Sequence, residues 1–181
     1  MRYSSREITE IGLGVALAWV LSVVRIYQMP QGGIISLEML PIFLLAIRRG
    51  PRVGVTTGLI FGLFRLLPLP LAEPPFLVHP AQVILDYPLP FVLCGLAGYF
   101  RGKSLPWTLS GIAVGSVARF FSHFASGVIF FASYAPAGQS VWWYSLVYNG
   151  TYMVPQMLIC LLITPLVLRL LPRLPGKEER I

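Results

Sequence analysis

The sequence predicts an all-α integral membrane protein, a bundle of six transmembrane helices with both termini in the cytoplasm. Of its 181 residues, 56% are hydrophobic, only 14 are Lys or Arg and 7 are Asp or Glu, and the mean hydropathy is +0.74. A soluble domain needs a polar outer face, whereas a bilayer solvates apolar side chains directly. The strict apolar/polar alternation of a membrane barrel is absent. Helices are therefore the expected spanning elements, since they pair their backbone groups internally.

The basic residues indicate the number and direction of the spans. Eleven of the 14 lie at alternate ends of the apolar stretches: Arg2, Arg6, Arg48, Arg49, Arg52, Arg101, Lys103, Arg169, Arg173, Lys177 and Arg180. The intervening connections, about 28–35, 70–78 and 133–141, contain no Lys or Arg. By the positive-inside rule this pattern predicts six spans with cytoplasmic termini. It also accounts for the net charge of +7 without a nucleic-acid partner.

The six spans are expected at residues 8–27, 33–47, 53–67, 77–100, 107–131 and 142–171. The first is opened by Ser4 and Glu7 at capping-box spacing, and we expect it to be retained rather than cleaved as a signal peptide. The second is short and carries Glu38 and Pro41. The third ends in the proline-rich stretch 68–75, because proline cannot continue a regular helix.

The last three spans are longer apolar runs, and they leave no room for a second domain. We therefore expect residues 1–181 to form a single domain. Cys94 and Cys160 fall within spans, where a free thiol behaves as a small hydrophobic group, so neither a disulfide nor a metal site is expected. The phosphate-loop motif G-x-x-x-x-G-K-[ST] is absent, so no cofactor is expected and any ATP would be used by a partner.

Three polar residues lie at a similar expected depth inside different spans: Asp86, His123 and Asn149. At about 1.5 Å rise per residue, Asp86 lies about 12 Å below the outer boundary. An ionised carboxylate at that depth costs on the order of 3 kcal/mol on insertion scales, so it should face the bundle interior and have a partner or a ligand. An ion pair with Arg65 or Arg119 is the structural alternative. Arg119 also precedes His123 by one turn and disfavours a second positive charge on the imidazole.

Together these residues suggest an outward-facing pocket with a carboxylate, a neutral imidazole, an amide and aromatic walls. Such a pocket suits a small, planar, cationic solute that also forms hydrogen bonds. Taken singly, the aromatic residues are equally compatible with the belt that anchors helices at the headgroup level. For Glu38, structural pairing is the preferred interpretation.

The first span carries small residues at four-residue spacing, a pattern that lets another helix approach closely. Gly12 and Ala16 form one such stripe, and Gly14, Ala18 and Ser22 form another. Packing within the bundle and contact with a partner helix both remain open from this pattern alone.

Four runs of the sequence resemble a known family: MPQGGIISLEMLPIFLLAIRRG (29–50), HPAQVILDYPLPFVLCGLAGYFRG (79–102), RFFSHFASGVIFFASYAPAG (119–138) and YSLVYNGTYM (144–153). They are similar to the thiamine-specific substrate-binding subunits of energy-coupling factor (ECF) transporters, in order and across the six-span layout. The resemblance implies a membrane protein that captures thiamine from outside. It further implies association with a transmembrane coupling protein and two ATP-binding-cassette ATPases that drive release inward.

The resemblance also implies roles for particular residues. The ligand contacts would be Asp86, Tyr87, His123, Gly127, Phe131, Tyr144, Ser145 and Asn149. The small-residue motif that meets the coupling protein would be Gly12 and Ala16. Some members of the family have a longer carboxylate at position 86 and a tryptophan at position 131, so the detailed ligand pose can differ here.

Other classes of function are less well supported. An intramembrane enzyme would need Ser122 or Ser126 to act with His123 and Asp86, yet neighbouring residues such as Ser122 and His123 point about 100° apart on a helix. A stand-alone secondary transporter is usually larger and built from repeats. A binding subunit for riboflavin, biotin or a thiamine precursor remains an alternative within the family.

Overall fold

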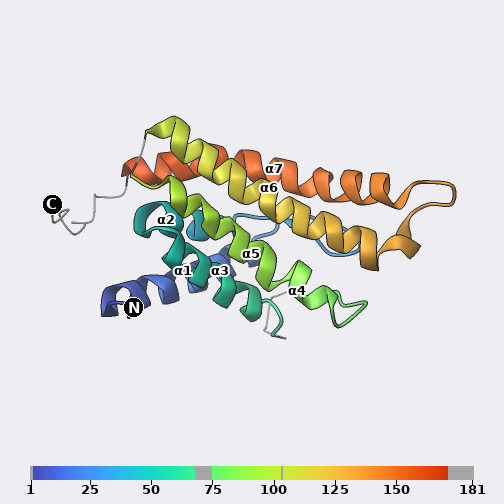
Figure 1. Ribbon diagram of the computed structural model, residues 1–181, viewed down its shortest axis with the longest axis horizontal. Coiled ribbons are helices and arrows are strands. Elements are labelled where there is room, and N and C mark those ends of the chain that lie inside the picture. Colours follow the sequence, from blue (N-terminus) through green and yellow to red (C-terminus); the bar gives the residue numbers. More distant parts are fainter. Residues whose placement is uncertain (1, 68–74, 103, 171–181) are drawn as a thin grey trace.

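The computed structural model describes residues 2–67, 75–102 and 104–170. Its helices are α1 (Ser5–Val23), α2 (Leu40–Arg49), α3 (Pro51–Phe64), α4 (Gln82–Asp86), α5 (Pro88–Cys94), α6 (Leu105–Phe130) and α7 (Val141–Leu170). Two 3-10 segments, η1 (Gly95–Phe100) and η2 (Ala132–Tyr134), and two short strands, β1 (Tyr27–Gln28) and β2 (Ile34–Ile35), complete the described chain. In Figure 1, α6 and α7 lie side by side along the long axis, while α1, α2 and α3 gather at one end.

The predicted all-α membrane bundle is confirmed. Each predicted span has a helical counterpart, with α4, α5 and η1 together forming the fourth. In the described part of the chain, three segments are long and apolar enough to cross a membrane: Gln82–Phe100, Leu105–Phe130 and Val141–Leu170. The α3 helix is apolar but shorter. The start of α1 and the end of α7 lie at the same end of the molecule (Figure 1).

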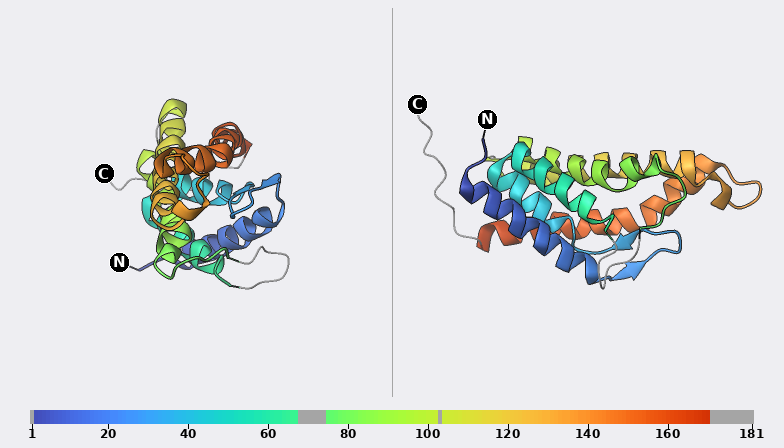
Figure 2. Two further views of the ribbon diagram at one scale, coloured as in Figure 1. Left: turned by 90° about the vertical axis from the view of Figure 1, so that its right-hand side faces the viewer. Right: turned by 90° about the horizontal axis from the view of Figure 1, so that it is seen from below.

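The predicted end of the first helix at residue 27 and the predicted start of the second helix at residue 33 are wrong. In place of helix, β1 and β2 pair antiparallel, with Tyr27 opposite Ile35 and Gln28 opposite Ile34. The turn between them contains Gly32 and Gly33 at φ +81° and +87°, a region of backbone conformation that favours glycine. The second helix therefore begins at Leu40 rather than at residue 33. Figure 2 shows this hairpin beside α7 in its right-hand view.

The fourth predicted span, 77–100, is also not one regular helix. Pro88 has no backbone N–H, and its ring opposes the carbonyl four residues earlier, so α4 ends at Asp86 and α5 starts at Pro88. A Cβ on Gly62 would lie 2.6 Å from Pro88 Cα, which only glycine avoids. The α3 helix thus packs closely against the break, and the break aims the end of α4 differently from α5.

Hydrogen bonding at the start of α1 follows the prediction. Ser4 Oγ accepts from the Glu7 amide (3.2 Å), and Glu7 Oε2 accepts from the Ser4 amide (2.7 Å), so the expected capping box is confirmed. Those contacts with Ser4 lower the pKa of Glu7 below its usual value. Further along α1, Glu10 pairs with Arg49 of α2 and ties the two helices together.

The core lies mainly among α1, α2, α3, α5 and α6, around the fully buried Phe43, Phe61 and Ile112. Several sequence features fall outside the described residues: Lys103, residues 68–74 of the proline-rich stretch, Leu171 at the expected end of the last span, and the basic residues Arg173, Lys177 and Arg180.

Candidate functional site

One cavity of about 900 Å³, counted with its open mouth, lies between the β1–β2 turn, the α4–α5 break, α6 and α7. Its lining includes every ligand contact expected from the sequence: Asp86, Tyr87, His123, Gly127, Phe131, Tyr144, Ser145 and Asn149. These residues come from segments up to about 60 positions apart, so their meeting at one cavity depends on the packing of the helices. Their roles toward a ligand remain predictions.

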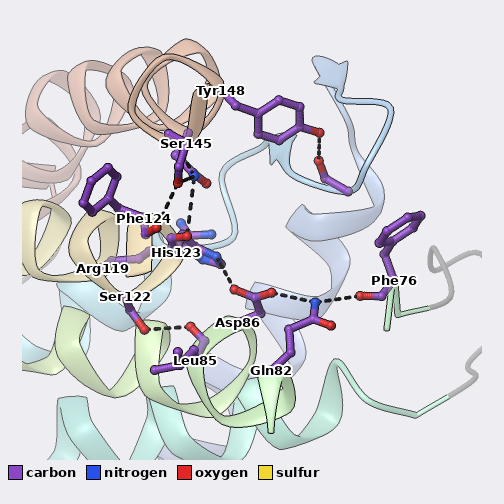
Figure 3. Close-up of polar contacts among 12 residues, drawn as sticks. Phe76, Gln82, Leu85, Asp86, Arg119, Ser122, His123, Phe124, Ser145 and Tyr148 are labelled. Atoms are coloured by element: carbon purple, nitrogen blue, oxygen red, sulfur yellow. Dashed lines mark hydrogen bonds and ion pairs between the residues drawn. The ribbon is translucent and has the colours of Figure 1, made fainter. Parts of the chain in front are cut away.

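Asp86 lies at the last turn of α4, in contact with two neighbouring side chains (Figure 3). Its Oδ2 accepts from Gln82 Nε2 at 2.7 Å, and its Oδ1 lies 3.2 Å from His123 Nδ1. Gln82 is itself held by the chain that precedes α4, since it donates to the Phe76 carbonyl and accepts from the Val78 amide. Asp86 is therefore set rigidly at the cavity wall with 13% of its side chain exposed.

The contact with Asp86 determines the tautomer of His123. Because an ionised carboxylate can only accept, Nδ1 must carry the proton in this contact. In the neutral ring the lone pair is then on Nε2, which is buried and has no hydrogen-bond partner among the described residues. The imidazole thus offers an unused acceptor to a ligand N–H or O–H.

Polar side chains also join α6 to α7. Ser145 Oγ donates to the Phe124 carbonyl at 2.8 Å, and Asn149 Nδ2 donates to the Ser145 carbonyl at 2.9 Å. Tyr152 in turn donates to Asn149 Oδ1 at 2.9 Å. A Cβ on Gly127 would overlap Ser145 Oγ, so glycine is what lets the helices meet here. The donors of Ser145 and Asn149 are thus already used within the wall, which leaves these residues mainly acceptor capacity toward the cavity.

The β1–β2 turn forms the part of the lining opposite α6. Tyr148 donates to the Gly32 carbonyl at 2.8 Å and accepts from the Gln31 amide at 2.9 Å. A Cβ on Gly33 would come within 2.8 Å of the Tyr152 ring. Contacts with Tyr148 and Tyr152 therefore hold the turn against α7, and the backbone of the turn lines the cavity.

The aromatic residues near the outer end of the helices differ in whether they line the cavity. Phe131, Phe76 and Tyr144 line the cavity, and Phe131 stacks on Phe76 with ring centroids 6.0 Å apart. Trp142 and Trp143 are 63% and 56% exposed and lie outside the lining, as expected for the aromatic belt.

The floor of the cavity contains an ion pair. Arg119 Nη2 lies 3.1 Å from Glu38 Oε1, and Arg119 Nη1 donates to Gln156 Oε1 at 3.0 Å. Glu38, Arg119 and Gln156 are each at most 3% exposed. The expected structural pairing of Glu38 is thus confirmed. The alternative pairing of Asp86 with Arg119 is wrong, since Asp86 contacts His123 and the Arg119 guanidinium contacts Glu38 and Gln156.

The sequence did not predict several residues that line the cavity. Tyr148 was missed, although the four-residue spacing of Tyr144, Tyr148 and Tyr152 places them on one face of α7 and could have indicated it. His79 precedes α4, stacks on Phe130 with ring centroids 5.1 Å apart and does not line the cavity.

The two small-residue stripes of α1 have different surroundings. Gly14, Ala18 and Ser22 are buried, and a Cβ on Gly14 would collide with Leu45. Gly12 and Ala16 instead line an apolar groove between α1 and α3, and a Cβ on Gly12 would meet open space. The stripe of Gly14, Ala18 and Ser22 thus packs within the bundle, whereas the stripe of Gly12 and Ala16 faces outward.

Comparisons with known proteins agree on one family. Residues 8–175 match the family described as "Thiamine transporter protein (Thia_YuaJ)". The chain is 39% identical to the thiamine transporter ThiT of Bacillus subtilis, over 96% of this chain and 95% of that protein. It is 33% identical to the ThiT of Lacticaseibacillus paracasei, over 75% and 73% of the two chains. A solved structure of ThiT from Listeria monocytogenes superposes with a TM-score of 0.81 at 28% identity, covering 92% of this chain and 95% of the other.

Proposed function

The chain belongs to the thiamine transporter protein family, and from that membership we propose that it is the thiamine-binding S component of an ECF-type vitamin importer. It is a membrane protein, and because its family consists of transporters it is not an enzyme. The observation that carries the proposal is the cavity, whose lining includes all eight residues expected to contact the vitamin.

The chemistry of the cavity matches that of thiamine. Thiamine has a permanently charged thiazolium ring, an aminopyrimidine ring with donors and acceptors, and a hydroxyethyl arm. Asp86 supplies a negative charge, His123 Nε2 supplies a buried acceptor, and Phe131 and Tyr144 supply ring faces. Aromatic faces and a carboxylate both attract a cation, so the set favours a planar cationic ligand. Catalysis by Ser122 is disfavoured because its hydroxyl donates to the Leu85 carbonyl at 2.6 Å (Figure 3).

We extend the proposal to location and partners. The protein lies in a prokaryotic plasma membrane as one transmembrane domain, with both termini in the cytoplasm, and it captures thiamine from outside. A coupling protein binds the outward-facing stripe of Gly12 and Ala16, and two ATP-binding-cassette subunits supply the energy for release. The exposed position of this stripe and the open space at Gly12 support such a contact, because small residues let a partner helix approach closely.

Isothermal titration of the purified chain with thiamine, riboflavin and biotin tests the proposal. Calorimetry is preferable to intrinsic fluorescence, because Trp19, Trp107, Trp142 and Trp143 all lie outside the cavity lining. We expect saturable binding of thiamine at submicromolar concentration and no binding of the other two vitamins. A folded chain that does not bind thiamine would refute the proposed function, and preferential binding of another vitamin would replace it.

A further inference from the structure

We propose that Glu38 and Arg119 form a hydroxyl-recognition subsite at the cavity floor, which selects ligands with a free hydroxyl and rejects their phosphate esters. The inference rests on the proposed function, because it assigns the hydroxyethyl arm of thiamine to this floor. Neither residue was expected to contact the ligand from the sequence.

The ion pair between these residues is incomplete. In the guanidinium fork, Nε–H and Nη2–H point from the same edge, which usually grips both oxygens of a carboxylate. Here Nη2 contacts Glu38 Oε1 at 3.1 Å, while Arg119 Nε and Glu38 Oε2 are both buried with no hydrogen-bond partner among the described residues. Leaving a buried donor and a buried acceptor unpaired is costly, so this site is complementary to a group that satisfies both.

A single hydroxyl group is such a complement. It donates one hydrogen bond, which Glu38 Oε2 can accept, and it accepts one, which Arg119 Nε–H can donate. Residues Arg119 and His123 are one helical turn apart on α6, so the floor lies about 6 Å from the level of the Asp86–His123 contact. The cavity therefore has two polar levels, one for a ring with donors and one for an arm that ends in a hydroxyl.

The same floor disfavours phosphate. A phosphate monoester carries about −1.5 to −2 charge at neutral pH and offers almost only acceptors. The positive charge of Arg119 is already directed at Glu38 and Gln156, and the Phe91 ring centroid lies 4.8 Å from its Cζ. An esterified arm would place negative charge against the Glu38 carboxylate and remove the donor that Oε2 lacks.

The test compares three ligands: thiamine, its analogue with an ethyl arm, and thiamine monophosphate. For the wild-type chain we expect the ethyl analogue to bind about 10- to 150-fold more weakly than thiamine, the usual range for one hydrogen bond to a charged group. We expect the monophosphate to bind more weakly still. If thiamine and the ethyl analogue bind equally, an ordered water rather than the ligand satisfies the floor, and the inference is overturned.

Two variants test whether Glu38 and Arg119 cause the differences in affinity among the three ligands. Glu38→Gln should narrow the gap between thiamine and the monophosphate by at least tenfold. The double variant Glu38→Met, Arg119→Met removes both unpaired atoms without stranding a buried charge, and it should bind thiamine and the ethyl analogue within about threefold. Glu10→Gln is the matched control, because Glu10 also pairs with an arginine but lies outside the cavity, and it should leave all three affinities unchanged.

The outcomes separate this inference from the proposed function. A wild-type chain that binds thiamine, with ligand ratios unaltered in the folded variants, overturns the hydroxyl subsite and leaves the thiamine-binding function standing. A wild-type chain that binds none of the three ligands overturns the function itself.

Discussion

Replacing Asp86 by Asn should weaken thiamine binding by about 10- to 150-fold and leave the protein folded. Asp86 accepts from Gln82 at 2.7 Å and contacts His123 at 3.2 Å. An amide can accept from only one of these donors and turns its own NH₂ toward the other, so either the glutamine or the imidazole must move. The ligand cation also loses its opposing charge.

The magnitude follows from the type of interaction lost. Hydrogen bonds to a charged group contribute roughly 1.5–3 kcal/mol, and about 1.4 kcal/mol corresponds to tenfold in affinity. Asp86 is only 13% exposed, so solvent cannot replace the lost carboxylate fully. The loss of one such interaction therefore predicts about 10- to 150-fold.

The assay is calorimetric titration of detergent-purified wild type and variant with thiamine, with size-exclusion profile and circular dichroism to verify folding. The matched control is Glu7→Gln, another carboxylate-to-amide change, at an exposed helix cap far from the cavity lining. A folded Asp86→Asn protein with a dissociation constant within threefold of wild type would show that the carboxylate has no part in binding, and the assignment of the site would fail.

Three further predictions concern the walls and the outer face. Tyr148→Phe removes both hydrogen bonds to the 31–33 turn, so thiamine should dissociate about tenfold faster, measured by stopped-flow competition. Gly127→Ala places a methyl group against Ser145, so both the thermal midpoint and the thiamine affinity should fall, the latter at least tenfold by calorimetry. Gly12→Leu adds bulk where space is open, so thiamine binding should be unchanged while co-purification with the proposed coupling protein is lost.

Each of these predictions has an outcome that contradicts it. An unchanged dissociation rate in Tyr148→Phe would mean that the turn does not retain the ligand. Full thermal stability of Gly127→Ala would mean that α6 and α7 separate easily. For the third, Gly14→Leu is the matched control, since it should destabilise the fold through Leu45. Loss of thiamine binding in Gly12→Leu would place that stripe in the core instead.

The approximate order and extent of the helices were predictable because hydropathy and charge placement are properties of contiguous segments. Predictions failed where backbone chemistry overrode apolar composition. Pro88 divides the fourth span although its neighbours are hydrophobic, and Gly32 and Gly33 turn the chain where a second helix seemed due. A hydropathy average does not register a missing amide or a positive φ, so these errors have a common origin.

The sequence by itself determined that the protein is a helical membrane bundle and that Asp86, His123 and Asn149 are unusual polar residues for their depth. Only the tertiary structure decided their partners. Arg119 follows Glu38 by 81 positions, and nothing along the chain distinguished Glu38 from Asp86 as its counter-ion. That choice depends on how α2, α4 and α6 rotate and approach one another, because an ion pair forms only within a few ångströms, while hydropathy is summed over whole turns of helix.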